Sequence, residues 1–137
     1  MLGLASCSRT EPSKGFATAW SAADDRFQAD PSWRGGDAAY SVVLGPERVL
    51  WLFGDSFVGS AEGQDRTRAG RVMVRNSIAV QTSADPSRGE VEFFHGEGAA
   101  EPEAFFGWQD PQWLWPGPGL RLDDTLLLTF MVVASSS

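Results

Sequence analysis

Residues 126–133 (LLLTFMVV) predict a β-strand that is apolar on both of its faces. Such a strand requires cover on both sides, as in the interior of packed sheets. The turn-prone pair Asp123–Asp124 and, before it, residues 120–122 complete a predicted hairpin with a tight loop. Because one hairpin cannot cover both of its own faces, we expect further layers of sheet around it.

Four earlier segments are rich in β-branched and aromatic residues, which favours strands. These segments are residues 38–44, 49–53, 72–74 together with 77–82, and 91–94. Their Gly, Pro and charged residues predict turns at 45–48 and 84–89, and loops at 29–36 and 59–70. Residues 16–26 fit either a short helix or an irregular strand, and their periodicity does not decide between the two.

The segment at residues 96–119 joins these strands to the last hairpin and is rich in Gly, Pro and Trp. It is too broken by Gly and Pro to predict a regular element and too aromatic for a solvated linker. We therefore expect it to be an irregular crossover that packs against the rest of the fold.

The first and last hairpins begin alike. Residues 36–53 and 118–130 each run from a glycine through a short strand and a turn into a strongly apolar strand. A four-stranded sheet repeated radially builds a β-propeller, whereas a single sandwich or open barrel of six strands is the alternative. Because residues 126–133 need cover that these strands do not supply, we predict an all-β fold, the first one and a half blades of a longer β-propeller.

The charge balance bears on the class of partner. There are 11 Lys and Arg residues against 18 Asp and Glu residues, which gives a net charge of -7. No basic cluster could follow a phosphate backbone, so the sequence argues against nucleic acid as a partner. No apolar run reaches the roughly 20 residues that a membrane-spanning helix needs.

The single cysteine, Cys7, follows Leu4-Ala5-Ser6, and this tetrapeptide resembles a bacterial lipobox. The polar residues 8–15 resemble the tether between a lipid and a fold. The apolar part of the signal is short, and we expect residues 1–15 to be a truncated lipoprotein signal and tether, with lipidation at Cys7 and an upstream start. The alternative is a chance tetrapeptide before an ordinary cytosolic cysteine.

Four motifs together resemble the opening blade of a bacterial propeller family. They are residues 33–41 (WRGGDAAYS), 50–57 (LWLFGDSF), 74–80 (VRNSIAV) and 113–117 (WLWPG). Members of that family are mostly secreted or lipid-anchored proteins of unknown function, and they are similar to five-bladed glycoside hydrolases that include arabinan-degrading enzymes. The resemblance implies that residues 16–137 are the N-terminal part of a five-bladed propeller.

The resemblance also implies a catalytic role for Asp37. In such hydrolases, carboxylates at the start of inner strands act on a sugar in the central channel, one as base or nucleophile and one, from a later blade, as acid. Asp37 follows two glycines and opens the first strand, which is the matching position, and the acid is expected beyond Ser137. This chain departs from the family at Pro118, where a carboxylate is often found. Alternatively, Asp37 accepts backbone N–H bonds in its own loop.

Three further residues are candidates for contact with substrate. Asp55, at the end of the most apolar strand of the first hairpin, could point at a ligand or brace the blade by pairing with Arg75. Arg75 and Asn76 carry planar groups with several donors, which suit sugar hydroxyls, and bracing Asp55 is their alternative role.

Tryptophans are candidates for stacking on sugar rings. Trp113 and Trp115 alternate around Leu114, so both are expected on one side of an extended chain, and we count them as substrate-binding candidates. Packing between blades is the alternative, and for Trp51 it is the prediction. Trp33 and Trp108 share the same two interpretations.

No metal or cofactor is predicted. His95 is the only histidine and cannot build a zinc site by itself. Asp24, Asp25 and Asp30 offer oxygen ligands that could hold a structural Ca²⁺, but their spacing matches no EF-hand loop.

The resemblance to the propeller family and to a lipobox together imply an extracytoplasmic carbohydrate-active protein. We expect a glycoside hydrolase-like protein that uses inner-strand carboxylates on a polysaccharide such as arabinan, is monomeric at full length, and meets the membrane only through Cys7. The alternatives are a non-catalytic glycan-binding or scaffold lipoprotein, and an inert fragment whose last hairpin exposes both apolar faces.

Overall fold

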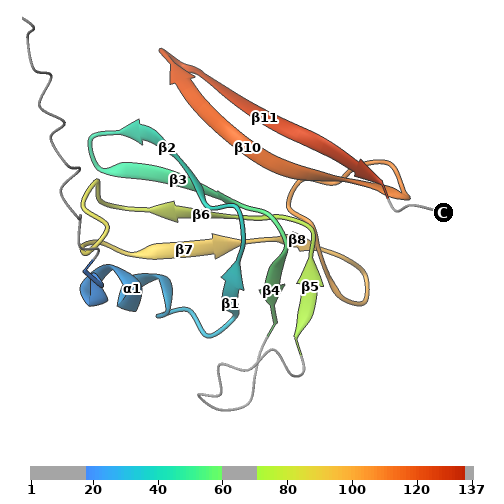
Figure 1. The fold of residues 1–137 in the computed structure, drawn as a ribbon, viewed down its shortest axis with the longest axis horizontal. Coiled ribbons are helices and arrows are strands. Elements are labelled where there is room, and N and C mark those ends of the chain that lie inside the picture. Colours follow the sequence, from blue (N-terminus) through green and yellow to red (C-terminus); the bar gives the residue numbers. More distant parts are fainter. Residues whose placement is uncertain (1–17, 60–70, 135–137) are drawn as a thin grey trace, which may run out of the picture.

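The computed structural model describes residues 18–59 and 71–134. Cys7, its tether and all but the first residue of the loop predicted over residues 59–70 lie outside the described residues. The described part is almost entirely antiparallel sheet, with one short helix, α1 (Ser21–Phe27) (Figure 1). The strands are β1 (Trp33–Gly36), β2 (Tyr40–Gly45), β3 (Arg48–Phe53), β4 (Ser56–Val58), β5 (Val72–Val74), β6 (Ser77–Gln81), β7 (Val91–Phe94), β8 (Gly96–Glu97), β9 (Pro102–Glu103), β10 (Gln112–Leu122) and β11 (Thr125–Ala134). The predicted all-β fold class is confirmed.

A four-stranded antiparallel sheet, in the order β2-β3-β6-β7, forms the centre of the fold. β3, one of its two central strands, is buried on both faces. Leu50 and Leu52 are buried on one side of the sheet, and Val49 and Phe53 are buried on the other. The hydrophobic residues form two clusters, one on either side of the sheet. This meander is the strand arrangement of one propeller blade.

A small sheet in the order β1-β4-β5 packs on one of these clusters, which consists of Trp33, Phe53, Val58, Val74 and Ala79. Trp33 of β1 is buried there, stacks on Phe93 with ring centroids 4.1 Å apart, and donates its indole N–H to Ser77 Oγ at 3.2 Å. The loop predicted over residues 29–36 is therefore wrong for its second half. Pairing with β4 draws the glycine-rich segment into a strand, and Gly36 is needed there because a Cβ would lie 2.6 Å from Ser56 Oγ.

The N-terminal ambiguity is settled in favour of a helix over Ser21–Phe27. Phe27 meets the ring of Trp51 edge-on at 5.0 Å and also contacts Phe93, so the helix covers one end of the sheet. Trp51 packs as predicted, and its indole N–H donates to Gln81 Oε1 at 2.9 Å.

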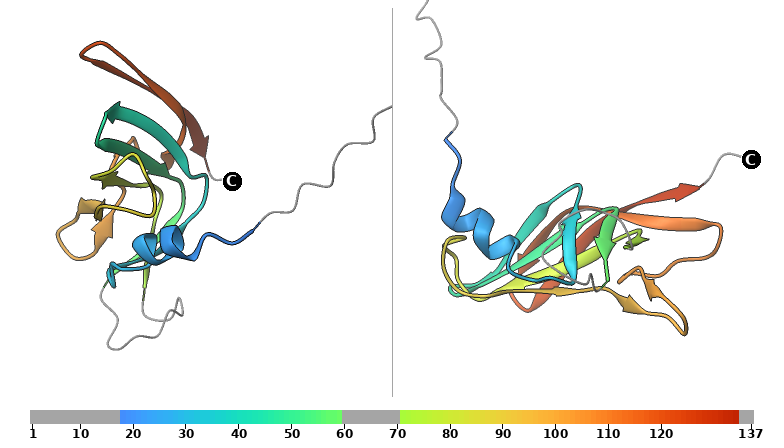
Figure 2. Two further views of the ribbon diagram at one scale, coloured as in Figure 1. Left: turned by 90° about the vertical axis from the view of Figure 1, so that its left-hand side faces the viewer. Right: turned by 90° about the horizontal axis from the view of Figure 1, so that it is seen from below.

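The last hairpin, β10–β11, lies beside β2 as a separate two-stranded layer (Figure 2). Its tight loop at Asp123–Asp124 is confirmed, with Asp123 at φ 50°. The irregular structure predicted up to residue 119 is wrong from Gln112 onward, because β10 runs through the Pro-Gly repeat. Its register shifts between Pro116 and Gly119, and prolines are tolerated at such a bulge in a strand paired on one side only.

The face of β11 that carries Leu128 and Phe130 is covered only in part, and its other face is largely exposed. Leu128 and Phe130 face inward, and Phe130 contacts Phe106 with ring centroids 4.8 Å apart. Large apolar side chains remain exposed elsewhere on the hairpin: Leu120, Leu122, Leu126, Leu127, Met131 and Val132. The described residues therefore supply only part of the cover that residues 126–133 were expected to need.

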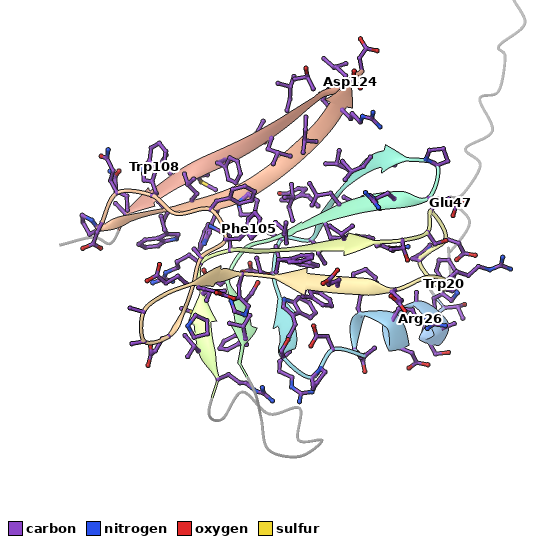
Figure 3. The ribbon with its side chains drawn as sticks, turned by 180° about the vertical axis from the view of Figure 1, so that it is seen from behind. Trp20, Arg26, Glu47, Phe105, Trp108 and Asp124 are labelled. Carbon is purple, nitrogen blue, oxygen red and sulfur yellow. The ribbon has the colours of Figure 1, made fainter. Side chains whose placement is uncertain are left out.

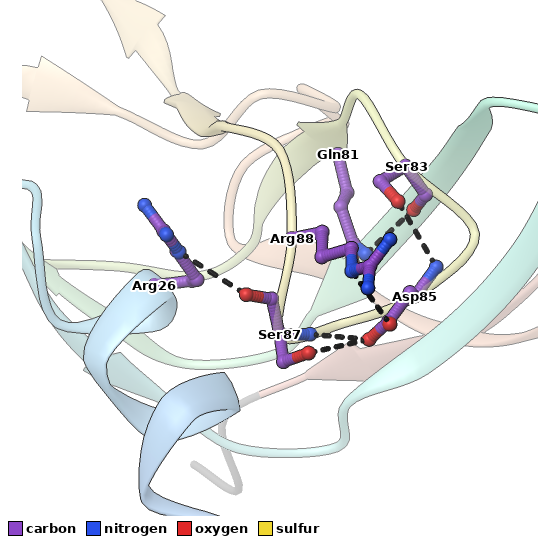
Figure 4. Close-up of polar contacts among 6 residues, drawn as sticks. All are labelled: Arg26, Gln81, Ser83, Asp85, Ser87 and Arg88. Atoms are coloured by element: carbon purple, nitrogen blue, oxygen red, sulfur yellow. Dashed lines mark hydrogen bonds and ion pairs between the residues drawn. The ribbon is translucent and has the colours of Figure 1, made fainter.

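The predicted turn at residues 84–89 is organised by Asp85 (Figure 4). Its Oδ1 accepts the Ser87 hydroxyl at 2.6 Å and the Ser87 backbone N–H at 2.9 Å, and its Oδ2 lies 3.4 Å from Arg88 Nε. These hydrogen bonds, chiefly that of the Ser87 hydroxyl, and the nearby Arg88 charge hold the pKa of Asp85 below its usual value of 3.8.

We predict that Asp85→Ala lowers the thermal stability of the protein at neutral pH but not in acid. A carboxyl group with a lowered pKa in the folded state contributes stability above its unfolded pKa and loses that contribution as the pH falls. The Tm difference between wild type and variant should thus shrink as the pH falls from about 6 to about 3 in calorimetry. A constant difference across that range would contradict this role.

Candidate functional site

Asp37 directly follows β1 and is held by its main chain. Its backbone N–H donates to the Asp55 carbonyl at 3.2 Å, and its carbonyl accepts the Gly54 N–H at 2.9 Å. Its side chain is exposed and has no hydrogen-bond partner among residues 18–59 and 71–134. The main chain is therefore fixed by the neighbouring strand end while the carboxylate stays open to solvent and ligands.

Two local features set the place of this carboxylate. Gly54 lacks a side chain where a Cβ would stand 2.2 Å from Asp37 Oδ1, so only glycine leaves room for the carboxylate there. Ala38 follows with φ 50°, a left-handed conformation that costs a non-glycine residue about 1 kcal/mol. Backbone strain of this kind is frequent beside functional groups.

Asp55 is held by two side chains. Trp115 donates its indole N–H to Oδ1 at 3.1 Å, and Arg75 Nη1 lies 3.4 Å from Oδ2. The bracing contact between Asp55 and Arg75, considered from the sequence, is thus present. The contact with Trp115 was not predicted, because no local pattern in the sequence links Asp55, at a strand end, to a tryptophan 60 residues later in β10.

The two carboxylates share one depression of about 370 Å³. It is lined by Arg34, Gly35, Gly36, Asp37, Asp55, Phe57 and Met73. Arg34 was not a sequence candidate, yet its Nε is buried and has no hydrogen-bond acceptor within the described part of the chain. The depression therefore combines a partner-free carboxylate, a braced carboxylate and a buried donor, which together suit a polar ligand with several oxygen atoms.

Asn76 is fully buried, and its side chain forms hydrogen bonds only to backbone groups among the described residues. Its Nδ2 donates to the carbonyls of Phe106 at 3.1 Å and Leu114 at 2.9 Å, and its Oδ1 accepts the Phe106 N–H at 2.7 Å. Asn76 joins the central sheet to the crossover and to β10. Direct contact of Asn76 with substrate stays a prediction, and its position in this structure is that of a brace.

Trp113 and Trp115 lie on the same side of β10, as their spacing suggested, with ring centroids 6.4 Å apart and edge to face. The Arg75 guanidinium lies 4.3 Å from the centre of the Trp113 ring. Arg75 and Trp115 therefore both contact Asp55, and the Trp113 ring packs against the Arg75 guanidinium. Trp33 is in the core, whereas Trp108 is 54% exposed.

The possible metal ligands are scattered. Within residues 18–59 and 71–134, no three His, Cys, Asp or Glu side chains are grouped so that they could hold a metal ion. Asp30 instead accepts the backbone N–H and hydroxyl of Ser32, and His95 Nδ1 lies 2.9 Å from the Gly96 carbonyl oxygen. Of the helices in the described ranges, none is long and apolar enough to cross a membrane.

The blade-like antiparallel sheet places the protein in an all-β, propeller-like fold class. The depression beside it holds two carboxylates. A family described as a domain of unknown function, DUF5005, matches residues 22–137, and the chain belongs to this family. No curated protein sequence matches the chain.

Among solved structures, the chain is similar to a crystal structure from Bacteroides ovatus that is provisionally described as a hydrolase. The TM-score is 0.66 at 18% sequence identity, and the match covers 85% of this chain. It covers 34% of the other chain, so the present chain spans about a third of that structure. At this identity the likeness establishes a common fold.

Proposed function

We propose that this chain is the N-terminal part of a five-bladed β-propeller that acts on polysaccharide outside the cytoplasm, with arabinan as the first candidate substrate. Its chemistry is glycoside hydrolysis by carboxylates in the depression beside β1 and β4. The provisional description of the Bacteroides ovatus structure as a hydrolase agrees with this class of reaction.

One observation carries the proposal: Asp37 and Asp55 line the same depression in different surroundings. Glycosidic bond cleavage needs a carboxylate that is free to act as base or nucleophile, and a second carboxylate nearby can stabilise the positive charge of the transition state. Asp37 has no partner among the described residues and is free to act as base or nucleophile, whereas Asp55 is bound by Trp115 and Arg75.

The braced state of Asp55 assigns it a supporting role. The Trp115 N–H and the Arg75 guanidinium engage both of its carboxylate oxygens, so Asp55 is less free than Asp37 to act on a substrate directly. It fits a group that binds sugar hydroxyls and stabilises positive charge in the oxocarbenium-like transition state. The general acid is proposed to lie on a later blade of the intact protein.

The test is incubation of the intact protein with a panel of soluble polysaccharides, namely linear arabinan, xylan and mixed-linkage glucan, followed by an assay for new reducing ends. We expect release of oligosaccharides from at least one of them. The absence of release from every polysaccharide would contradict hydrolysis.

A non-catalytic glycan-binding protein is the second candidate, and the exposed Trp108 favours it because an aromatic platform suffices for binding. The same panel separates the two candidate functions, since a binding protein is retarded by polysaccharide in affinity electrophoresis but releases no reducing ends. In that case, Asp37→Asn should leave retention unchanged.

Lipid attachment at Cys7 is part of the proposal and rests on the sequence alone. We predict that the intact wild-type protein incorporates an alkyne fatty acid during metabolic labelling and sediments with membranes, and that Cys7→Ser does neither. Equal labelling of the two proteins, or a wild-type protein that stays in the soluble fraction, would contradict the anchor.

A further inference from the structure

A second depression shares the lining residue Met73 with the depression that holds Asp37. It has a volume of about 410 Å³, within the range of small-molecule sites, and residues of β5, the crossover and the start of β10 line it. We propose that it is a distal sugar subsite that binds the outlying residues of an oligosaccharide whose reacting bond lies at Asp37. This inference rests on the proposed function.

The first support is an exposed aromatic surface. Trp108 is 54% exposed and lines the depression, and its indole N–H donates to Gln112 Oε1 at 3.3 Å. This hydrogen bond orients a ring that would otherwise turn freely. An oriented indole face exposed to solvent suits the apolar face of a sugar ring.

The second support is a donor without an acceptor. The Trp113 Nε1 is buried and has no hydrogen-bond partner in the part of the chain that the structure describes. Leaving a buried indole N–H unsatisfied is unfavourable, and tryptophan N–H groups usually find a partner. Trp113 lines the same depression, so an oxygen of a bound ligand could accept this hydrogen bond.

The charges around the depression select the ligand. Glu103 and Asp110 add two carboxylates to its wall, and the positive charge of Arg75 is shared with Asp55. An anionic ligand would be repelled there, whereas the hydroxyl groups of a neutral sugar can donate to carboxylates and accept from the indole N–H. The surroundings therefore favour a neutral polyhydroxyl chain.

The third support is continuity with the candidate catalytic depression. Met73 lines both depressions, and it is 42% exposed. Arg75 lines the second depression and reaches Asp55 of the first, with Nη1 3.4 Å from Oδ2. A single oligosaccharide could pass over Met73 and contact both.

The test measures binding of short and long oligosaccharides to the intact protein in the Asp37→Asn background, so that no hydrolysis occurs. The probes are arabinobiose and arabinohexaose, with xylobiose and xylohexaose as a second pair, in titration calorimetry. Trp108→Ala should weaken hexaose binding about tenfold and leave biose binding unchanged. Trp113→Phe, which keeps a ring and removes the N–H, should weaken hexaose binding about fivefold.

Trp20→Ala is the matched control, because Trp20 is 53% exposed and lies at the opposite end of the molecule (Figure 3). Its hexaose affinity should equal that of the parent. If hexaose binds and Trp108→Ala leaves its affinity unchanged, or if Trp20→Ala lowers it equally, the distal subsite is wrong and the proposed function stands. If neither hexaose binds the parent protein, this inference fails, whereas the proposed function is decided separately by the release of oligosaccharides from the polysaccharide panel.

Discussion

Asp37→Asn should lower the rate of polysaccharide hydrolysis by the intact protein about a thousandfold, because the substitution removes the carboxylate that acts as base or nucleophile. Asparagine has nearly the same shape as aspartate. Because the Asp37 side chain makes no hydrogen bond within the described residues, the substitution breaks none there. Its main-chain bonds to Gly54 and Asp55 are kept. Rates of reducing-end release, measured with a folded variant, check this prediction.

Gly54→Ala tests the same assignment by displacing the carboxylate without replacing it. The added methyl group would lie 2.2 Å from Asp37 Oδ1 and must push this flexible side chain aside, at little cost to the fold. We expect kcat to fall at least tenfold with the Tm almost unchanged, because a small misplacement of a reacting group costs much of its effect.

Gly45→Ala is the matched control, because the nearest atom to a Cβ there is Arg121 Nη1 at 4.0 Å and Gly45 lines neither depression. It should hydrolyse polysaccharide as the wild type does. Hydrolysis by Asp37→Asn at a rate close to that of the wild type would show that the reacting carboxylate is another residue.

Asn76→Leu should destabilise the fold by about 3 kcal/mol, the largest stability effect that we expect from a single substitution in the described residues. The side chain is of similar size, but three hydrogen bonds are lost, and the N–H and carbonyl of Phe106 and the carbonyl of Leu114 lose a partner. Urea unfolding followed by tryptophan fluorescence measures the change in the free energy of unfolding.

Gln109→Leu makes the same chemical change at an exposed amide and should alter stability by less than about 0.5 kcal/mol. Since Asn76 also holds the start of β10, its loss should disturb the contact of Trp115 with Asp55 and lower activity at temperatures where the protein is still folded. A free energy of unfolding for Asn76→Leu close to that of wild type would contradict the brace.

The strands of the central sheet could be predicted because their patterns are local. Residues 49–53 are apolar throughout and include one β-branched and two aromatic residues, and Pro46 and Asp123 mark turns by their own backbone preferences. The strand β1 could not be predicted in the same way. Its two glycines favour a loop, and only its pairing with β4, distant in sequence, makes it a strand.

The site was partly visible in the sequence. Asp37 and Asp55 stood out because each lies beside glycines at a strand end, and the structure brings both to one depression. The roles of Trp115 and Arg34 were not visible, since an indole N–H that binds Asp55 and a buried guanidinium arise only from tertiary packing. For Asn76 the residue type suggested ligand contact, and burial alone reveals the brace.

A crystal structure of the intact Asp37→Asn protein with a bound oligosaccharide of its polysaccharide substrate tests the central claim most directly. We predict a sugar ring in the depression lined by Arg34, Asp55 and Phe57, with the residue 37 side chain within hydrogen-bond distance of the glycosidic bond. An oligosaccharide bound elsewhere, with residue 37 touching no sugar atom, would contradict the assignment of Asp37 and of this depression.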